Sequence, residues 1–141
     1  MTDDAYRAHV FLREIRSLNI LLAINELEQE DMFNKAQGCG SFSTGLKVQT
    51  SPKGDAMELA IAKLVELENE HERILGEIFA KMEYTDEMFE GLTMDESSIL
   101  RLYYFQRCTD EKISDIIHLS RQRVNQLRHV ALEKMGRRMK D

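Results

Sequence analysis

Side chains that can donate hydrogen bonds are concentrated in one short segment near the C-terminus. Ser120 precedes a run that reads RQRVNQLR, and the polar members of this run share one helical face: Arg121, Gln122, Arg123, Asn125, Gln126 and Arg128. Arginine can bond the edge of guanine bidentately, and glutamine or asparagine can do the same with adenine. Neither Asp nor Glu stands among them, although acids are preferred in the first turn of a solvated helix. The pattern predicts a helix that reads base edges in double-stranded DNA.

A second short helix is expected just before this one and would brace it. Thr109 precedes Asp-Glu-Lys and can cap a helix over the residues DEKISDII, with Ile113, Ile116 and Ile117 facing inward. His118-Leu119 then make a tight turn, and Ser120 caps the reading helix. The buried stripe of that helix is expected to be Val124, Leu127, Ala131 and Leu132. Residues 109–135 therefore predict a helix-turn-helix, with an ordinary pair of core helices as the alternative.

The charge of the chain is unevenly distributed. The net charge over 141 residues is -6. Residues 91–141 hold ten basic and seven acidic side chains, whereas residues 1–90 hold nine and eighteen. A chain with one basic end suits a protein that touches nucleic acid with that end and another partner with the other. A solvated basic helix is the plainer interpretation of the same counts.

The positions expected to contact DNA extend beyond the reading helix. Arg137 and Arg138 lie past the groove-reading turns and are expected to bind phosphates. A capped helix N-terminus also favours a nearby phosphate. The full predicted DNA-binding set is Thr109, Ser120, Arg121, Gln122, Arg123, Asn125, Gln126, Arg128, Arg137 and Arg138.

The rest of the chain predicts an all-α fold built on a long helical hairpin. Apolar residues recur at helical spacing over 4–35, and a helix stop is expected at Gly38-Cys39-Gly40. Residues 36–54 form the expected loop, a second helix runs from about Asp55 to Met82 or beyond, and a break follows over 83–94. Asp95 is expected to cap the next helix. The predicted domains are the hairpin, 1–90, and the helix-turn-helix domain, 91–141.

A heptad seam in the hairpin predicts self-association. Apolar residues of the second helix alternate four and three apart, as in a coiled coil. A lone two-helix hairpin buries too little surface to be stable, so this seam is expected to pack on a second copy, with a dimer favoured. The predicted oligomerisation residues are Leu18, Leu22, Leu64, Leu67, His71, Ile74 and Ile78.

The C-terminal segment resembles region four of sigma factors, the part that reads the upstream promoter element. The resemblance is carried by Arg101 to Phe105, Thr109 to Ile117, Ser120 to Leu127, and Ala131 to Met135. It implies base contacts by Arg121, Gln122, Asn125 and Gln126. Two features depart from sigma factors. Arg128 and His129 replace residues that are commonly acidic or small, and nothing upstream resembles the promoter-melting region.

The order of elements also resembles small phage and prophage late-transcription regulators of the ArpU/RinA kind. The similarity rests on a loop with Pro52 to Asp55, a helix with Ala62 to Glu68, and the sigma-like segment. It implies a sequence-specific transcriptional regulator, with host RNA polymerase as a further candidate partner. A small terminase subunit that binds viral DNA for packaging, and a sigma/anti-sigma-like interaction protein, are the alternatives.

Several other functional classes are not expected. Cys39 and Cys108 lack metal-ligand spacing, and no phosphate loop or nucleophile elbow is found, so no metal, cofactor or enzymatic activity is predicted. The chain contains no run of eighteen apolar residues and no signal-peptide pattern at its start. Two cysteines are too few for a disulfide framework. The expected location is the cytoplasm of a bacterial host, without a membrane partner.

Overall fold

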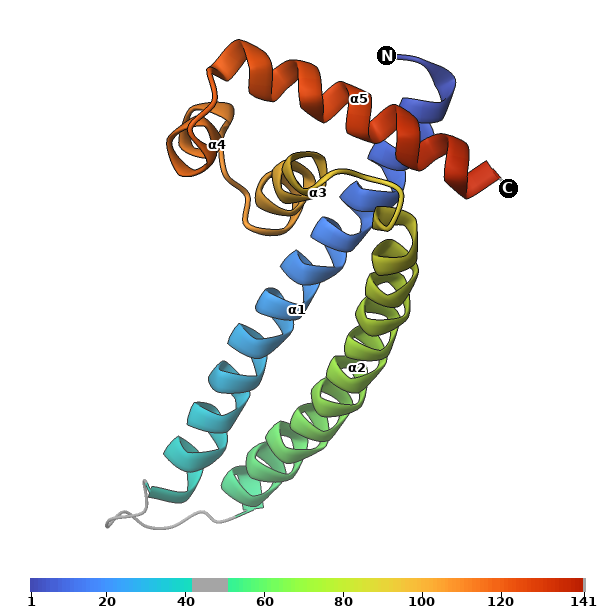
Figure 1. Ribbon diagram of the computed structural model, residues 1–141. Helices are drawn as coiled ribbons and strands as arrows, with labels where there is room; N and C mark the ends of the chain where they lie inside the picture. The colour runs from blue at the N-terminus through green and yellow to red at the C-terminus, as the bar shows by residue number, and fades with distance from the viewer. Residues whose placement is uncertain (42–50, 141) are drawn as a thin grey trace. The chain divides into compact units, whose positions relative to one another are not determined.

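The computed structural model describes residues 1–41 and 51–140 of the chain. Its elements, in order, are α1 (Asp3–Ser41), α2 (Ser51–Phe89), α3 (Met94–Leu100), the π-helix η1 (Arg101–Phe105), α4 (Asp110–Ile117) and α5 (Arg121–Lys140) (Figure 1). The described residues contain no strand, so the prediction of an all-α fold is confirmed. None of their helices is both long enough and apolar enough to cross a bilayer.

The two long helices extend further than the sequence suggested. The predicted stop at Gly38 is wrong, because α1 continues to Ser41. A glycine costs a helix interior only about 1 kcal/mol, so it weakens a helix without ending it. Helix α2 already begins at Ser51, which places Pro52 in the first turn, where proline's missing N–H is not needed. Of the predicted loop, residues 42–50 lie outside the described part.

The predicted break over 83–94 is also wrong in extent, because α2 continues to Phe89. Phe89 packs in the hydrophobic core, and this burial holds the last turns of α2 in helical form. The next helix is capped by Thr93 rather than by Asp95. Thr93 and Glu96 form a reciprocal capping box, in which the Thr93 N–H donates to Glu96 Oε1 at 2.9 Å and the Glu96 N–H donates to Thr93 Oγ1 at 3.2 Å.

Packing divides the chain into two compact units that do not follow the expected boundary at residue 90. The helix-turn-helix unit comprises Met1–Leu18 together with Ile78–Asp141, and the hairpin unit comprises Asn19–Glu77. Each long helix therefore contributes to both units. The first turns of α1 belong with the C-terminal helices because their apolar face packs on them.

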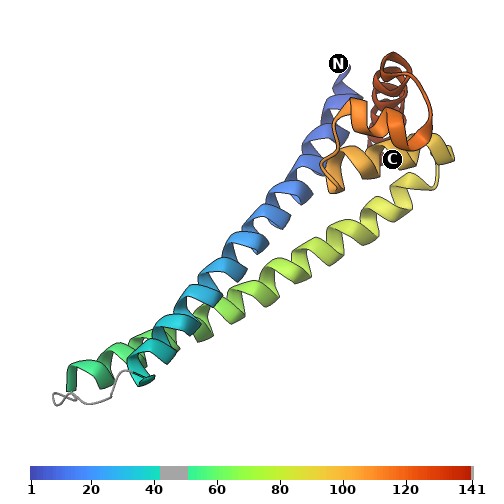
Figure 2. The ribbon, with the colours of Figure 1, turned by 90° about the vertical axis from the view of Figure 1, so that its left-hand side faces the viewer.

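The first turns of α1 form part of the core of the helix-turn-helix unit. Four small or aliphatic side chains of α1 pack against α5 and η1, namely Ala5, Ala8, Leu12 and Ile15. Helix α5 crosses these turns in Figure 1 and is seen nearly end-on in Figure 2. The crossing is so close at Gly136 that a Cβ added there would lie 1.8 Å from the Asp4 carbonyl oxygen. Glycine is therefore required at this contact.

A partly buried polar pair also ties α1 to η1. His9 Nδ1 and the Tyr104 hydroxyl are 2.6 Å apart, which fits a hydroxyl that donates to a neutral imidazole. Burial raises the pKa of Tyr104 to about 12, so the phenol keeps its proton. Burial, followed by the positive charges of Arg13 and Arg128, lowers the pKa of His9. Both effects favour the neutral pair.

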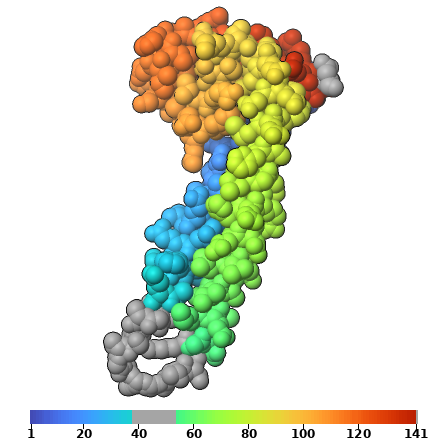
Figure 3. All heavy atoms as spheres, turned by 60° about the horizontal axis from the view of Figure 1, so that its bottom comes forward, coloured from blue at the N-terminus to red at the C-terminus, as the bar shows by residue number. Residues whose placement is uncertain are grey.

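The heptad seam of α2 is buried within the hairpin unit itself. Leu67 is 3% exposed, and Ile74 and Ala60 are also buried. The side-chain amide of Asn25 on α1 donates to the Leu67 carbonyl oxygen at 3.0 Å, and Gln29 Nε2 donates to Asn25 Oδ1 at 2.6 Å. Residues 19–37 and 54–77 adjoin along their length (Figure 3). The expectation that this seam is exposed for a second copy is therefore wrong for Leu67 and Ile74.

The other predicted oligomerisation residues are wholly or partly covered. Leu22, Leu64 and His71 are partly buried in the hairpin unit, and His71 Nε2 lies 4.0 Å from Glu26 Oε1. Leu18 and Ile78 belong to the helix-turn-helix unit, where Ile78 is buried and Leu18 partly buried. Self-association through any of them stays a prediction. The apolar side chains that the hairpin unit exposes are different ones.

Candidate nucleic-acid interface

Helices α4 and α5 are joined by a short turn with a cap at each helix start. The Lys112 N–H donates to Thr109 Oγ1 at 3.2 Å, and the Arg123 N–H donates to Ser120 Oγ at 3.1 Å. Both caps agree with the sequence prediction. His118 ends α4 in the left-handed conformation, with φ 60 and ψ 40. Ser114 Oγ donates to the Leu119 carbonyl oxygen and closes the turn from α4.

A small apolar core fixes the angle between the two helices. Ile99, Ile113 and Val124 are fully buried together, and Ile117 and Leu127 pack against them in partly buried positions. These inward assignments are confirmed, as are those of Ala131 and Leu132 in the neighbouring core.

The inward assignment of Ile116 is wrong, because this side chain is 45% exposed. At 3.6 residues per turn, Ile116 points about 80° away from the midpoint of Ile113 and Ile117. A helix of two turns has too narrow a buried stripe to include it.

The first two turns of α5 expose a set of side chains that we call the reading face. It comprises Arg121, Gln122, Arg123, Asn125 and Gln126, all of which are exposed. No carboxylate belongs to it, and Val124 on the opposite side of the helix anchors it to the core. The side chains can therefore approach a ligand without disturbing the fold.

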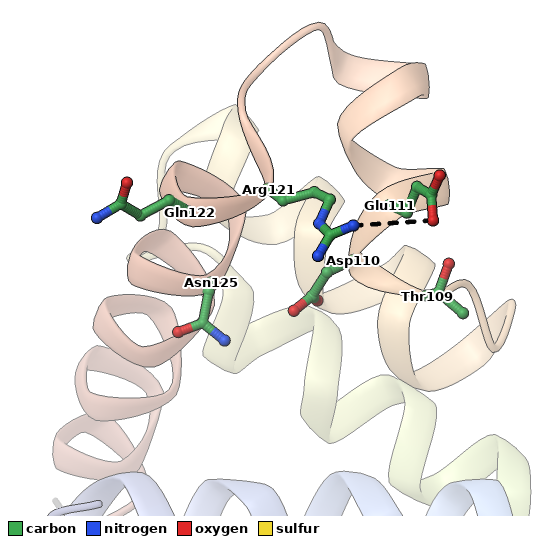
Figure 4. A pocket seen from close by; sticks show the side chains of 6 residues that line it. All are labelled: Thr109, Asp110, Glu111, Arg121, Gln122 and Asn125. Carbon is green, nitrogen blue, oxygen red and sulfur yellow. Dashed lines mark ion pairs between the residues drawn. The ribbon is translucent and has the colours of Figure 1, made fainter.

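The reading face borders a polar hollow of about 650 Å³ between α4 and α5 (Figure 4). Arg121, Gln122 and Asn125 line it from α5, and Thr109, Asp110 and Glu111 line it from the start of α4. Arg121 Nη1 lies 3.9 Å from Glu111 Oε2, and both side chains are mostly exposed. Exposed ion pairs contribute little to stability, so Arg121 can exchange Glu111 for a more strongly binding anion or base edge.

Gln126 and Arg123 interact on the exposed surface. Arg123 Nη1 donates to Gln126 Oε1 at 3.3 Å. This long contact between two exposed side chains leaves the Gln126 amide N–H groups available to a ligand.

Arg128 is not on the exposed face, which corrects the sequence interpretation. Its side chain is 11% exposed, and its Nη2 lies 3.1 and 3.4 Å from the two Asp110 carboxylate oxygens. The guanidinium also lies over the Tyr103 ring, 4.2 Å from its centroid. The side chain folds back because Asp110 and Tyr103 together offer it a charge partner and an aromatic face. The prediction that Arg128 contacts DNA is untested, and we leave it out of the reading face.

Arg137 and Arg138 lie near the far end of α5, away from the reading face along the helix. Arg137 Nη2 is 3.3 Å from Glu133 Oε1 on the same helix. Arg138 Nε donates to the Glu87 carbonyl oxygen at 3.1 Å, and its Nη2 is 3.6 Å from Glu90 Oε2. Both side chains remain substantially exposed, and their predicted phosphate contacts stay a prediction.

Sequence reasoning missed two further arginines near the interface, Arg16 and Arg107. Both line a second hollow next to Thr109 and Asp110. Arg16 was assigned to a hairpin helix, and nothing in its spacing indicates that the first turns of α1 pack beside α5. Arg107 follows η1 with φ 55, a left-handed backbone that no sequence signal announced.

Comparisons with known proteins agree with this geometry for one part of the chain. No curated protein matches the chain, and no solved structure matches it. Residues 88–136 match the family model of Sigma-70, region 4. The matched segment runs from the end of α2 into α5 and contains both caps, the turn and the whole reading face. Residues 88–136 are a helix-turn-helix like that of Sigma-70 region 4.

Proposed function

We propose that this protein is a sequence-specific double-stranded DNA-binding transcriptional regulator. The observation that carries the proposal is the reading face, whose five exposed donor-bearing side chains occupy the first two turns of a Ser-capped helix. In a helix-turn-helix these turns enter the major groove. The match of the same segment to Sigma-70 region 4 supports the assignment.

The types of side chain favour base readout over backbone binding alone. Gln122, Asn125 and Gln126 are neutral, so they add nothing to phosphate attraction at long range, but their amides can bond adenine bidentately. Arg121 and Arg123 can bond guanine in the same groove. Thr109 and Ser120 cap the two helices, and these N-termini can lie against phosphates on either side.

The finer proposal is a regulator of phage or prophage type that acts without a catalytic step. It rests on the resemblance to such regulators described above, which is carried by Pro52 to Asp55, Ala62 to Glu68 and the sigma-like segment. The hairpin unit is the proposed contact for protein partners, with a second copy as the first candidate and RNA polymerase as the next. Residues 19–77 carry eleven acidic and five basic side chains, so the hairpin is unsuited to contact DNA.

The proposed surface for self-association is an apolar stripe on α1, rather than the buried seam. Ile20, Ile24 and Leu27 recur four and three apart, and all three are exposed by 40% or more. Leu21 adjoins them. Such a stripe on a helical hairpin is typical of an interface, since water contact with it is unfavourable.

The test of this function is selection of binding sites from a pool of randomised DNA duplexes. The full chain is expected to enrich one site, and the double variant Gln122→Ala/Asn125→Ala is expected to lose preference at particular base positions. Gln37→Ala, an exposed change in the hairpin unit, is the matched control and should enrich the same site. A pool that shows no enrichment over its starting composition would contradict the proposal.

A further inference from the structure

A basic hollow lies beside the reading face, within the helix-turn-helix unit. Its volume is about 350 Å³. Three arginines from three separate elements line it: Arg16 from α1, Arg107 from the η1–α4 connection, and Arg128 from α5. The Thr109 side chain lines it as well, at the start of α4.

The positive charge in this hollow is only partly balanced. Asp110 is the one carboxylate that lines it, and both of its oxygens are engaged by Arg128. Across residues 1–41 and 51–140, no ion pair within 4.0 Å is recorded for Arg16 or Arg107. In addition, Arg128 Nε is buried and has no hydrogen-bond partner among the described atoms. The hollow therefore has the electrostatic character of an anion site.

The local backbone at Arg107 is unusual. Its φ of 55 lies in the left-handed region, which glycine or asparagine adopts more easily than arginine. It lies two residues after Phe105, the last residue of the π-helical segment η1. Packing does not require arginine here, because this side chain is exposed. An arginine held at such a position is therefore explained better by its charge than by the fold.

The basic hollow is continuous with the hollow that borders the reading face. Thr109 and Asp110 line both of them. A duplex whose major groove holds the first turns of α5 must carry one sugar–phosphate strand across the start of α4. A strand at that place would lie against Thr109, which lines the same hollow as Arg107 and Arg16. A guanidinium group frequently binds phosphate through two parallel hydrogen bonds. Arg107 is exposed and Arg16 is partly exposed, so both guanidinium groups can reach such a phosphate.

We propose that Arg16 and Arg107 bind a backbone phosphate of the duplex that α5 reads, so that α1 is part of the DNA-binding surface. This inference rests on the proposed function and extends it. Arg16 lies outside residues 88–136, so the contact is an addition to the part that resembles Sigma-70 region 4. The site strengthens binding to every sequence and leaves discrimination to the reading face.

The test compares four variants of the full chain: Arg16→Gln, Arg107→Gln, Arg16→Lys and the control Arg73→Gln. Arg73 is an exposed arginine of the hairpin unit. Affinity is measured by fluorescence anisotropy from 50 to 200 mM salt, on a selected duplex and on a scrambled one. Loss of one phosphate contact reduces the log–log salt slope by about 0.9, which is roughly a 3.5-fold smaller change in affinity over this range. Arg16→Gln and Arg107→Gln each remove one of the two arginines at the shared phosphate, so each should lower the slope, by up to this amount, on both duplexes alike. Arg73→Gln should match the unmodified protein, and Arg16→Lys should retain the slope.

A duplex with single neutral methylphosphonates identifies the phosphate itself. Neutralising the contacted position should weaken binding by the unmodified protein more than binding by Arg16→Gln, which has already lost one of the two arginine contacts. If the unmodified protein binds DNA and Arg16→Gln keeps its affinity and slope, the phosphate site is refuted while the proposed function stands. If the unmodified protein shows no salt-dependent duplex binding, both are refuted. Stabilisation by millimolar inorganic phosphate that needs Arg16, with an unchanged duplex slope, would identify a free-anion site and overturn the DNA assignment.

Discussion

Arg121 and Arg128 occupy the same helix and have opposite environments. The Arg121 side chain is 68% exposed and makes one long ion pair, whereas Arg128 is held by both Asp110 oxygens and by the Tyr103 ring. The first is available to a ligand, and the second joins α5 to the start of α4 and to η1. A residue's distance along the helix from the cap therefore does not decide whether its side chain is available to a ligand.

Arg128→Ala is expected to destabilise the protein by about 1–3 kcal/mol, because Asp110 loses its partner in a half-buried position and Tyr103 loses its cation. The expected loss of stability is moderate because the Asp110 side chain retains 28% exposure. Urea unfolding followed by circular dichroism measures it. Arg121→Ala is the matched control and should change stability by less than about 0.5 kcal/mol. Equal unfolding midpoints for both variants would show that the ion pair between Arg128 and Asp110 has no structural role.

Glu96 links stability to pH. Burial alone would raise the pKa of this carboxyl, but hydrogen bonds from Lys134 and the Thr93 N–H outweigh burial and lower it below its ordinary value near 4.5. The ionised form is thus favoured by folding, and its contribution is present above pH 4.5 and is lost as the pH falls through the lowered pKa. Glu96→Gln should reduce stability at pH 7 and converge with the unmodified protein at low pH. Unfolding curves from pH 7 to pH 3, with exposed Glu111→Gln as control, test this; parallel pH profiles would contradict it.

At the scale of elements, local signals were sufficient for the helix-turn-helix. Thr109 and Ser120 are capping residues, and a cap acts over three or four residues, so its partner is visible in the sequence. The hairpin seam was also visible from its spacing. The helix that covers this seam could not be predicted, because a heptad stripe has the same pattern whether α1 or a second copy covers it.

Because the heptad seam is buried and the stripe on α1 is exposed, a carboxylate introduced at each place should have a different effect. Leu67→Glu places a carboxylate in the interior of the hairpin, beside Asn25, and should reduce helicity and cooperative melting. Ile24→Glu lies on the exposed stripe and should keep the melting curve while it abolishes self-association. Circular dichroism and light scattering at tens of micromolar protein, a range in which weak dimers still form, separate the two effects. A monomeric unmodified protein, or a dimer that survives Ile24→Glu, would contradict the proposed stripe.

At the scale of the whole molecule, the helix-turn-helix unit is assembled from both ends of the chain. Ala8, Leu12 and Ile15 are fully buried against the C-terminal helices, and Gly136 admits the Asp4 carbonyl at close range. None of this was visible from the sequence, because contacts between residues more than a hundred positions apart follow from tertiary packing alone. The predicted domain 91–141 accordingly omits part of its own core.

This composite core predicts that residues 91–141 do not fold alone. Without α1, the fragment exposes the faces of Tyr104, Leu132 and Met135, each of which is almost fully buried in the chain. The fragment should show weak helicity and no cooperative thermal transition, whereas residues 78–141 joined to residues 1–18 by a flexible linker should recover both. A sharp transition and dispersed amide resonances for 91–141 alone would show that α1 is dispensable for the fold.

Base reading by α5 can be tested with a single substitution, Gln126→Ala. The change is measured by titrating the full chain against the selected duplex and a scrambled duplex at one fixed salt concentration, with thermal melts of both proteins. We expect Gln126→Ala to lose about 1–3 kcal/mol of binding free energy on the selected duplex and much less on the scrambled one. The melting temperature should be unchanged, since the side chain is exposed. Gln37→Ala should bind both duplexes like the unmodified protein. Equal losses on the two duplexes, or a Gln126→Ala protein that unfolds, would remove this residue from the reading face and contradict the assignment of the helix.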